Sequence, residues 1–178
     1  MKSYEELISY LTEHVISDED PPKWKEMDFD AKPELSTESN RFKIHVRPSG
    51  DTGVISIHHP KTGKHIGTIS YNRAGKTAAR ITEMVKNPEN KDSKMMNEAI
   101  THLHDKHGYS FFSSTTMTTH GHRVWEDLSK THKIALYDKR KDPKKRLLSK
   151  DVIPSKKYQE NCAPHEAGKE YLLHKFEK

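Results

Sequence analysis

Alternating apolar and polar positions predict four strands between residues 41 and 85. The alternation is clearest over 41–47, where every second side chain is apolar, as in a half-buried strand. The other three predicted strands are 54–58, 66–71 and a segment from Ala79 to Val85. Between the second and third strands, Pro60 and Gly63 indicate a hairpin loop. The alternation of the fourth strand slips after Thr82, which predicts a β-bulge or an early strand end.

The spacing of apolar residues then changes to that of helices. Residues 95–103 carry an apolar face, Asp92 or Ser93 is the expected N-terminal cap, and Gly108 is the expected stop. A second helix is predicted to begin near Thr118. Its inner stripe is Gly121, Val124, Trp125 and Leu128. With short strands expected at 109–112 and 134–137, the order of elements predicts an α/β (α+β) fold with a mixed, mostly antiparallel sheet flanked by helices.

Charge divides the chain into a central core and two arms. Residues 17–40 contain eight acidic residues and three lysines, a balance of −5, whereas residues 139–157 contain nine basic and two acidic residues, a balance of +7. Prolines in both segments disfavour continuous helix. We therefore expect an N-terminal helix over 1–16, an acidic linker arm over 17–40, a core domain over 41–139, a basic arm over 140–163 and a C-terminal helix over 164–178.

Composition narrows the class of protein. The 178 residues suit one domain, and the net charge is only +5. The single cysteine, Cys162, can form neither an internal disulfide nor a cysteine-based zinc site. No apolar run is long enough for a membrane span, and no secretory signal is visible. We expect a soluble protein that is not secreted and has no membrane partner.

Histidines and basic residues supply the candidate binding chemistry. Thirteen histidines are present, but a supported metal motif such as His-Glu-x-x-His is missing, so no metal is predicted. The basic arm could neutralise several phosphates and so bind nucleic acid without sequence preference. The expected contacts are Lys141, Lys144, Lys145, Arg146 and Lys150. The alternative is that both arms are solvated linkers or pair with each other.

Residues 41–139 resemble the GNAT superfamily of N-acetyltransferases in their order of elements. The best local match is 118–128, which is similar to the family's Asn-x-x-Ala-x-x-Leu-Tyr-Glu-Lys-Leu helix. Gly121 takes the place of the small residue, Val124 that of the aliphatic one, and Glu126 and Leu128 are identical. In general character the chain resembles the divergent GNAT-like proteins of large tailed bacteriophages.

This resemblance implies acetyl-CoA as cofactor and a pyrophosphate-binding turn before the first core helix. The implied cofactor contacts are Met84, Val85, Asn90, Lys91, Ser93 and Lys94. The turn departs from the family pattern, because it has no glycine and because Glu89 and Asp92 would repel phosphate. The cofactor is therefore predicted to be either bound weakly or lost.

The resemblance also bears on catalysis. Trp125 stands where the family often has a tyrosine that serves as the general acid, and an indole N–H cannot take that role at neutral pH. The catalytic candidates are thus Trp125, by position, and Tyr137 as a substitute.

The first 13 residues resemble the targeting peptides of phage internal head proteins, which are removed after Leu/Ile-x-Glu, here Leu11-Thr12-Glu13. The alternative is an ordinary first helix. The function expected from all these features is a GNAT-like phage protein, either an N-acetyltransferase acting on an amine or a binding scaffold without cofactor. The rival is a non-enzymatic virion or host-takeover protein that binds nucleic acid or a host protein. The expected location is the host cytoplasm or the virion.

Overall fold

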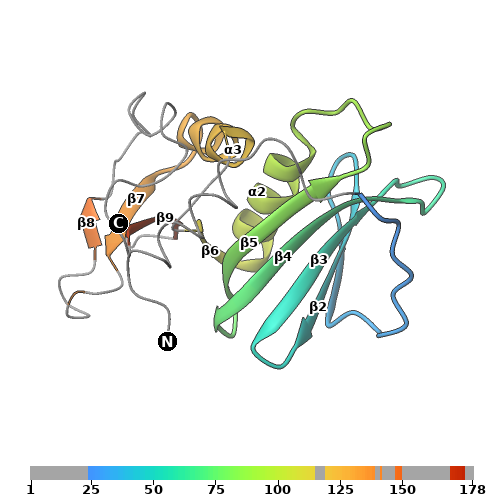
Figure 1. Ribbon diagram of the computed structural model, residues 1–178, viewed down its shortest axis with the longest axis horizontal. Helices are drawn as coiled ribbons and strands as arrows, with labels where there is room; N and C mark the ends of the chain where they lie inside the picture. Colours follow the sequence, from blue (N-terminus) through green and yellow to red (C-terminus); the bar gives the residue numbers. More distant parts are fainter. Residues whose placement is uncertain (1–23, 115–118, 139–140, 142–146, 150–168, 175–178) are drawn as a thin grey trace, which may run out of the picture.

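A computed structural model describes residues 24–114, 119–138, 141, 147–149 and 169–174 of the chain (Figure 1). These residues form nine strands and two helices. In chain order they are β1 (Leu35–Glu38), β2 (Lys43–Ser49), β3 (Thr52–His58), β4 (His65–Gly75), β5 (Ala78–Lys86), α2 (Met95–His107), β6 (Ser110–Phe112), α3 (Thr119–Ser129), β7 (Ile134–Asp138), β8 (Leu147–Ser149) and β9 (Lys169–Leu173).

All nine strands belong to one sheet, in the order β1-β2-β3-β4-β5-β6-β9-β7-β8. Each neighbouring pair is antiparallel except β5 and β6, which are parallel. Figure 1 shows β2 to β5 on one side of β6 and β7 to β9 on the other. The predicted α/β class, with a mixed and mostly antiparallel sheet, is therefore confirmed.

The local signals in the sequence match the observed strand register. Gly63 has a φ of 69° in the loop that joins β3 to β4, and the hairpin is closed by the His59 N–H donating to the Lys64 carbonyl at 2.9 Å. Between β4 and β5, Tyr71 pairs with Ile81 while Ser70 pairs with Glu83, so Thr82 is the extra residue. Of the two alternatives predicted for the slip after Thr82, the β-bulge is confirmed, because the strand continues to Lys86.

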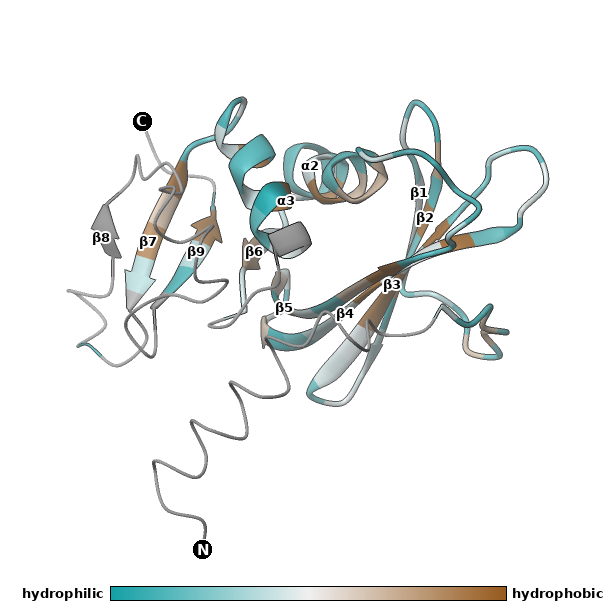
Figure 2. Ribbon diagram, turned by 45° about the horizontal axis from the view of Figure 1, so that its top comes forward, coloured by the Kyte–Doolittle hydropathy of each residue, from teal (hydrophilic) through white to brown (hydrophobic). Residues whose placement is uncertain are grey.

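The core lies between one face of the sheet and the two helices. Figure 2 shows α2 against the face formed by β2 to β5. The side chains that meet there are fully buried, among them Ile44, Ile55, Ile57, Ile69, Met95, Ile100 and Leu103. The first helix ends at Gly108 as predicted, with a left-handed φ of 70°. Its N-cap is Lys94, without a side-chain cap bond, so the prediction of Asp92 or Ser93 was wrong.

Three strands lie where the sequence predicts arms or helix. Strand β1 lies in the predicted acidic linker arm, and β8 lies in the predicted basic arm. Strand β9 replaces the helix predicted over 164–178 in the part of that segment that the structure describes. It enters the sheet between β6 and β7, where it gains hydrogen-bonded neighbours on both edges. The predicted helix over 1–16 lies outside the described residues.

Candidate functional site

The two parallel strands at the centre of the sheet form a fork. Strands β5 and β6 pair only over Ala78–Arg80 and Ser110–Phe112. Beyond this point the chain after β6 follows β9, because the Ser113 N–H donates to the Tyr171 carbonyl at 2.9 Å. Strand β5 continues to Lys86 without β6, paired only with β4, and leads into the turn over 87–94, which connects it to α2. This turn is where the GNAT resemblance places the cofactor pyrophosphate.

Side-chain oxygens of the turn accept hydrogen bonds from the turn's own backbone N–H groups. Asn87 Oδ1 accepts from the Glu89 N–H, Asn90 Oδ1 from the Asp92 N–H, and Asp92 Oδ1 from the Lys94 N–H, each at 2.9 Å. These are three successive Asx turns, in which a side-chain oxygen binds the backbone two residues on. Three N–H groups that could face an anion therefore already have an acceptor.

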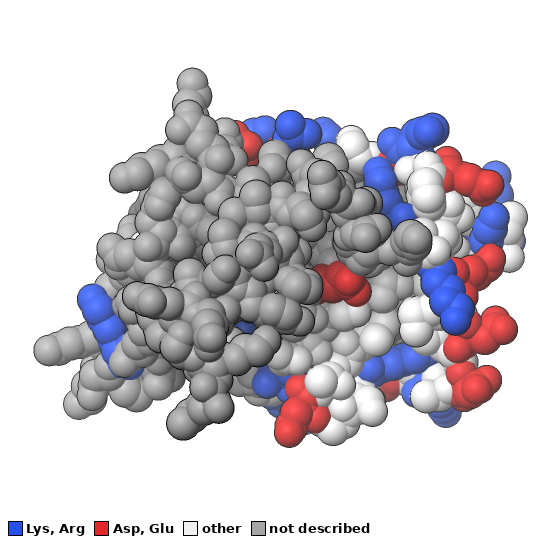
Figure 3. All heavy atoms as spheres, viewed as in Figure 1, with Lys and Arg blue, Asp and Glu red and all other residues white. Residues whose placement is uncertain are grey.

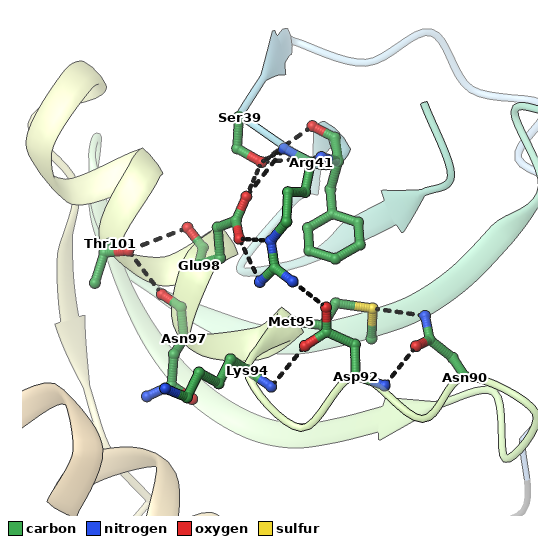
Figure 4. A network of polar contacts seen from close by, with 10 residues as sticks. Ser39, Arg41, Asn90, Asp92, Lys94, Met95, Asn97, Glu98 and Thr101 are labelled. Carbon is green, nitrogen blue, oxygen red and sulfur yellow. Dashed lines mark hydrogen bonds and ion pairs between the residues drawn. The ribbon is translucent and has the colours of Figure 1, made fainter. Parts of the chain in front are cut away.

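An arginine from the loop before β2 fixes the turn from outside (Figure 4). The Arg41 guanidinium forms ion pairs with Asp92 and with Glu98 Oε2, the latter at 2.6 Å. Glu98 Oε1 also accepts from the Ser39 hydroxyl at 2.7 Å and from the Arg41 N–H at 3.2 Å. The hydrogen bond to Glu98 is the main cause that raises the pKa of Arg41, so this side chain stays cationic. We call Arg41, Asp92 and Glu98 the turn lock.

The turn lock does not fit a bound pyrophosphate. A phosphate needs free N–H donors and positive charge at such a turn, and close approach is easiest over glycine. Here the Asp92 carboxylate already holds the Lys94 N–H and the Arg41 guanidinium. The Asp92 carbonyl also accepts from Lys86 Nζ at 3.2 Å. The anion in this turn is therefore a carboxylate of the chain itself.

The residues implied as cofactor contacts lie together around the turn. Met84 and Val85 are half-buried on β5 beyond the fork, and Asn90 is half-buried in the turn. The exposed members are Lys91, Ser93 and Lys94. Their adjacency is as the sequence implied, whereas their role in binding a cofactor stays a prediction.

The two catalytic candidates lie in different surroundings. Trp125 on α3 is only 1% exposed, and its ring centroid is 6.1 Å from that of Tyr171. It is therefore a core residue rather than one that faces a ligand. Tyr137 is half-buried on β7, and its ring lies edge-on to Phe112 at 5.1 Å. Tyr137 is thus the candidate that lies near the fork.

A buried ion pair at the fork was not predicted from the sequence. Arg80 Nε lies 2.6 Å from Glu170 Oε2, and the Glu170 side chain is 0% exposed. The guanidinium also lies over the Phe112 ring at 5.1 Å, and Glu170 is the cross-strand neighbour of Tyr137. We call Arg80, Phe112, Tyr137 and Glu170 the fork group. Since 90 residues separate Arg80 from Glu170, no local signal could have joined them.

The candidate contacts to nucleic acid are mostly outside the described residues. Lys141 is described and exposed. The remaining four, Lys144, Lys145, Arg146 and Lys150, lie outside, so nucleic-acid binding by the basic arm stays a prediction.

Two negative findings apply to the part of the chain that the structure describes. No group of three or more His, Cys, Asp or Glu side chains there could hold a metal ion. No helix there is long and apolar enough to cross a membrane.

The fold defined by this sheet and its fork is similar to that of solved GNAT-family acetyltransferases, the class that the sequence resemblance names. One is an acetyltransferase of the GNAT family from Bacillus anthracis, with a TM-score of 0.41 and 11% identity, covering 78% of this chain and 96% of that chain. Another is an acetyltransferase of the GNAT family from Staphylococcus aureus Mu50, with a TM-score of 0.36 and 8% identity, covering 69% of this chain and 68% of that chain. No protein-family model and no curated protein sequence matches the chain. The likeness is one of fold alone, and a phage origin stays a prediction.

Proposed function

We propose that this chain is a binding scaffold with an acetyltransferase-like fold, in which the cofactor turn is closed by the chain's own side chains. The observation that carries this proposal is the Asp92 carboxylate, which accepts the Lys94 N–H at 2.9 Å and pairs with Arg41. A tethered carboxylate has no entropy of association to lose, so it competes well with a free phosphate for the same donors.

The charges at the turn make acetyl-CoA binding still less favourable. The two acids within the turn are Glu89, whose side chain is 82% exposed, and Asp92, whose side chain is 24% exposed. Each carboxylate within a few ångströms of a pyrophosphate costs on the order of 1 kcal/mol at a solvated surface. Two such terms weaken affinity by about 10- to 100-fold. We expect no acetyl-CoA binding below roughly 100 µM.

Calorimetric titration of the full chain with acetyl-CoA tests this proposal. The wild type should show no binding in the micromolar range. Asp92→Ala removes the internal anion and should bind at least about tenfold more tightly than the wild type, at about 1.4 kcal/mol per decade. Asp127→Ala is the matched control, since it removes a partly exposed acid of α3, away from the turn, that pairs with Lys130. Micromolar binding by the wild type would contradict the scaffold.

One observation favours the second candidate, N-acetyl transfer to an amine. The fork group places a buried carboxylate, Glu170, on the strand next to Tyr137, close to the point where β5 and β6 stop pairing. A carboxylate can hold a proton taken from an amine, and a tyrosine hydroxyl can donate one. This candidate requires that release of CoA from acetyl-CoA with an amine present is abolished by Tyr137→Phe. Lack of release in the wild type would leave the scaffold as the account of the fold.

The partner of the scaffold is expected to be nucleic acid or a host protein bound through the charged arms. The support is the uneven charge of the sequence, with a balance of −5 over 17–40 and +7 over 139–157. A phage origin and packaging in the virion belong to the same proposal and rest on the resemblance of the sequence alone.

A further inference from the structure

Three histidines lie in a row on the face of the sheet opposite α2. His45, His58 and His65 come from the neighbouring strands β2, β3 and β4. Their ring centroids are 5.0 Å apart between His45 and His58, and 5.3 Å apart between His58 and His65. Their neighbours Ile44 and Ile57 point to the core, so the imidazoles occupy the outer face. We call these three residues the histidine row.

The segment over 24–33, here called the strap, covers one end of the histidine row. The Trp24 and Phe29 rings lie 4.7 and 5.1 Å from the His65 ring. On β2, Arg47 lies over the Phe29 ring at 4.4 Å, and its Nε donates to the Ala31 carbonyl at 3.0 Å. A groove of about 330 Å³ remains between the strap and the sheet. The Phe29 ring also lies 6.2 Å from the His58 ring, so three ring contacts, one cation–π contact and two hydrogen bonds, at Met27 and Ala31, hold the strap.

One of those hydrogen bonds requires a neutral imidazole. His65 Nε2 lies 2.9 Å from the Gly67 carbonyl oxygen, which can only accept, so Nε2 carries the hydrogen. Nδ1 therefore has a free lone pair, and it accepts from the Met27 N–H of the strap at 3.3 Å. If Nδ1 took up a proton it would become a donor, so it could no longer accept from the Met27 N–H and this bond would break.

The second histidine of the row is arranged in the same way. His58 Nδ1 donates to the Gly63 carbonyl at 3.0 Å, so its Nε2 accepts from the Ser56 hydroxyl at 2.9 Å. Protonation of His58 would reverse the bond to Ser56 rather than break it, because the hydroxyl can also accept. The neutral form is therefore required by the Met27 bond of His65, whereas the bonds of His58 fit either form.

The charges around the row are of both signs. Positive charge comes from Arg47 on β2, from Lys43 beside His45 and from Lys64 at the groove. Negative charge comes from the strap, where Glu26 favours protonation of His65 and Asp28 lines the groove. Burial is the largest effect and lowers the pKa of His45, His58 and His65 below the ordinary range. Mutual repulsion along the row, together with Arg47, lowers the pKa values of His45 and His65 further.

We propose that the strap is a pH-operated latch, closed while His65 is neutral and released when His65 takes up a proton. Because released histidine binds protons more readily than buried histidine, the closed state is fully favoured above the ordinary histidine range of about 6.5. Its advantage is lost progressively as the pH falls through that range towards the lowered pKa of the closed state. Release uncovers the aromatic and cationic outer face of β2 to β4.

Fluorescence and hydrogen exchange of the full chain test the latch between pH 7.5 and pH 5. The emission of Trp24 should change with a midpoint below about 6.5. Amide protection over 24–33, corrected for the intrinsic rate, should fall about tenfold for each pH unit within the transition, while protection in β3 and β4 is retained. Trp24→Phe should remove the emission change, because Trp125 stays in the core.

Two pairs of variants separate the latch from general acid unfolding. His65→Gln should abolish the transition, while His132→Gln, which changes a histidine paired with Asp105 on the other side of the sheet, should keep it. Met27→Pro removes the N–H that His65 accepts and should release the strap at pH 7.5, whereas Met27→Ala keeps that N–H and should behave as the wild type. An unchanged transition in His65→Gln, a strap that stays protected in Met27→Pro, or no transition in the wild type would each overturn the proposal.

Discussion

Single residues show how closely neighbouring strands of the sheet pack. Gly53 on β3 pairs with Tyr71 on β4, and a Cβ at this glycine would overlap the tyrosine ring. Tyr71 is 4% exposed and belongs to the core, and burial raises its pKa to about 12. Gly53→Ala is expected to lower the free energy of unfolding by about 1–3 kcal/mol, measured by urea denaturation. Gly75→Ala, whose nearest neighbour would be Ala78 Cβ at 3.3 Å, should change it by no more than about 0.5 kcal/mol.

Removing one partner of the buried ion pair at the fork should lower the free energy of unfolding more than the glycine substitutions do. Arg80→Ala takes the guanidinium away from the Glu170 carboxylate, whose side chain is fully buried. We expect a loss of about 3 kcal/mol in the free energy of unfolding. The double variant Arg80→Met with Glu170→Gln should recover a large part of this loss, because no charge is then left inside. A loss in the double variant as large as in Arg80→Ala would show that the ion pair is not the cause.

At the scale of elements, the end of α2 depends on one glycine. Gly108 has a φ of 70°, a conformation that costs an L-residue roughly 1–2 kcal/mol, and a Cβ there would touch nothing within 4 Å. Gly108→Ala should therefore destabilise the chain by about 1 kcal/mol through backbone strain alone. Thermal unfolding measures this. Lys106→Ala, an exposed substitution in the last turn of the same helix, is the control and should have little effect.

Elements with a one-sided pattern could be predicted, and elements buried on both faces could not. Strand β2 and helix α2 each bury one face. Apolar residues therefore recur at every second position in the strand and at every third or fourth position in the helix, and both patterns are visible in the sequence. Strand β9 is covered on both faces, with Glu170 and Tyr171 both almost fully buried. Its sequence therefore does not alternate, and the sequence alone predicts a helix over 164–178, the segment that holds β9. The position of β9 depends on pairing with β6 and β7, which no local pattern encodes.

In the candidate site, too, the local features could be predicted from the sequence and the contacts between distant residues could not. The missing glycines and the acids of the turn were visible in the sequence, because they are local. The contact of Arg41 with the turn could not be predicted, since this residue lies 51 positions before Asp92. The role of Asn87 and Asn90 as acceptors for backbone N–H groups follows only from the hydrogen bonds in the structure.

At the scale of the whole molecule, the basic arm predicts how the chain would bind DNA. Contacts to phosphates release counterions, so affinity for duplex DNA should fall steeply between about 50 and 200 mM salt. Replacing Lys144, Lys145 and Arg146 together should flatten that slope in a fluorescence-anisotropy titration. The matched control replaces three other lysines, Lys43 on β2 and Lys61 and Lys64 in the loop between β3 and β4. An unchanged slope in the first triple variant would exclude the arm, and no binding at low salt would exclude nucleic acid as the partner.

The closed turn is the central claim for the molecule, and a backbone NMR titration tests it most directly. Acetyl-CoA is added to the ¹⁵N-labelled wild-type chain while the amides of Glu89, Asp92 and Lys94 are followed. Because Asn87, Asn90 and Asp92 already accept from these N–H groups, the three signals should not shift at ligand concentrations up to roughly 100 µM. Saturable shifts of the same three amides with a micromolar midpoint would contradict the scaffold and show that the turn binds the cofactor.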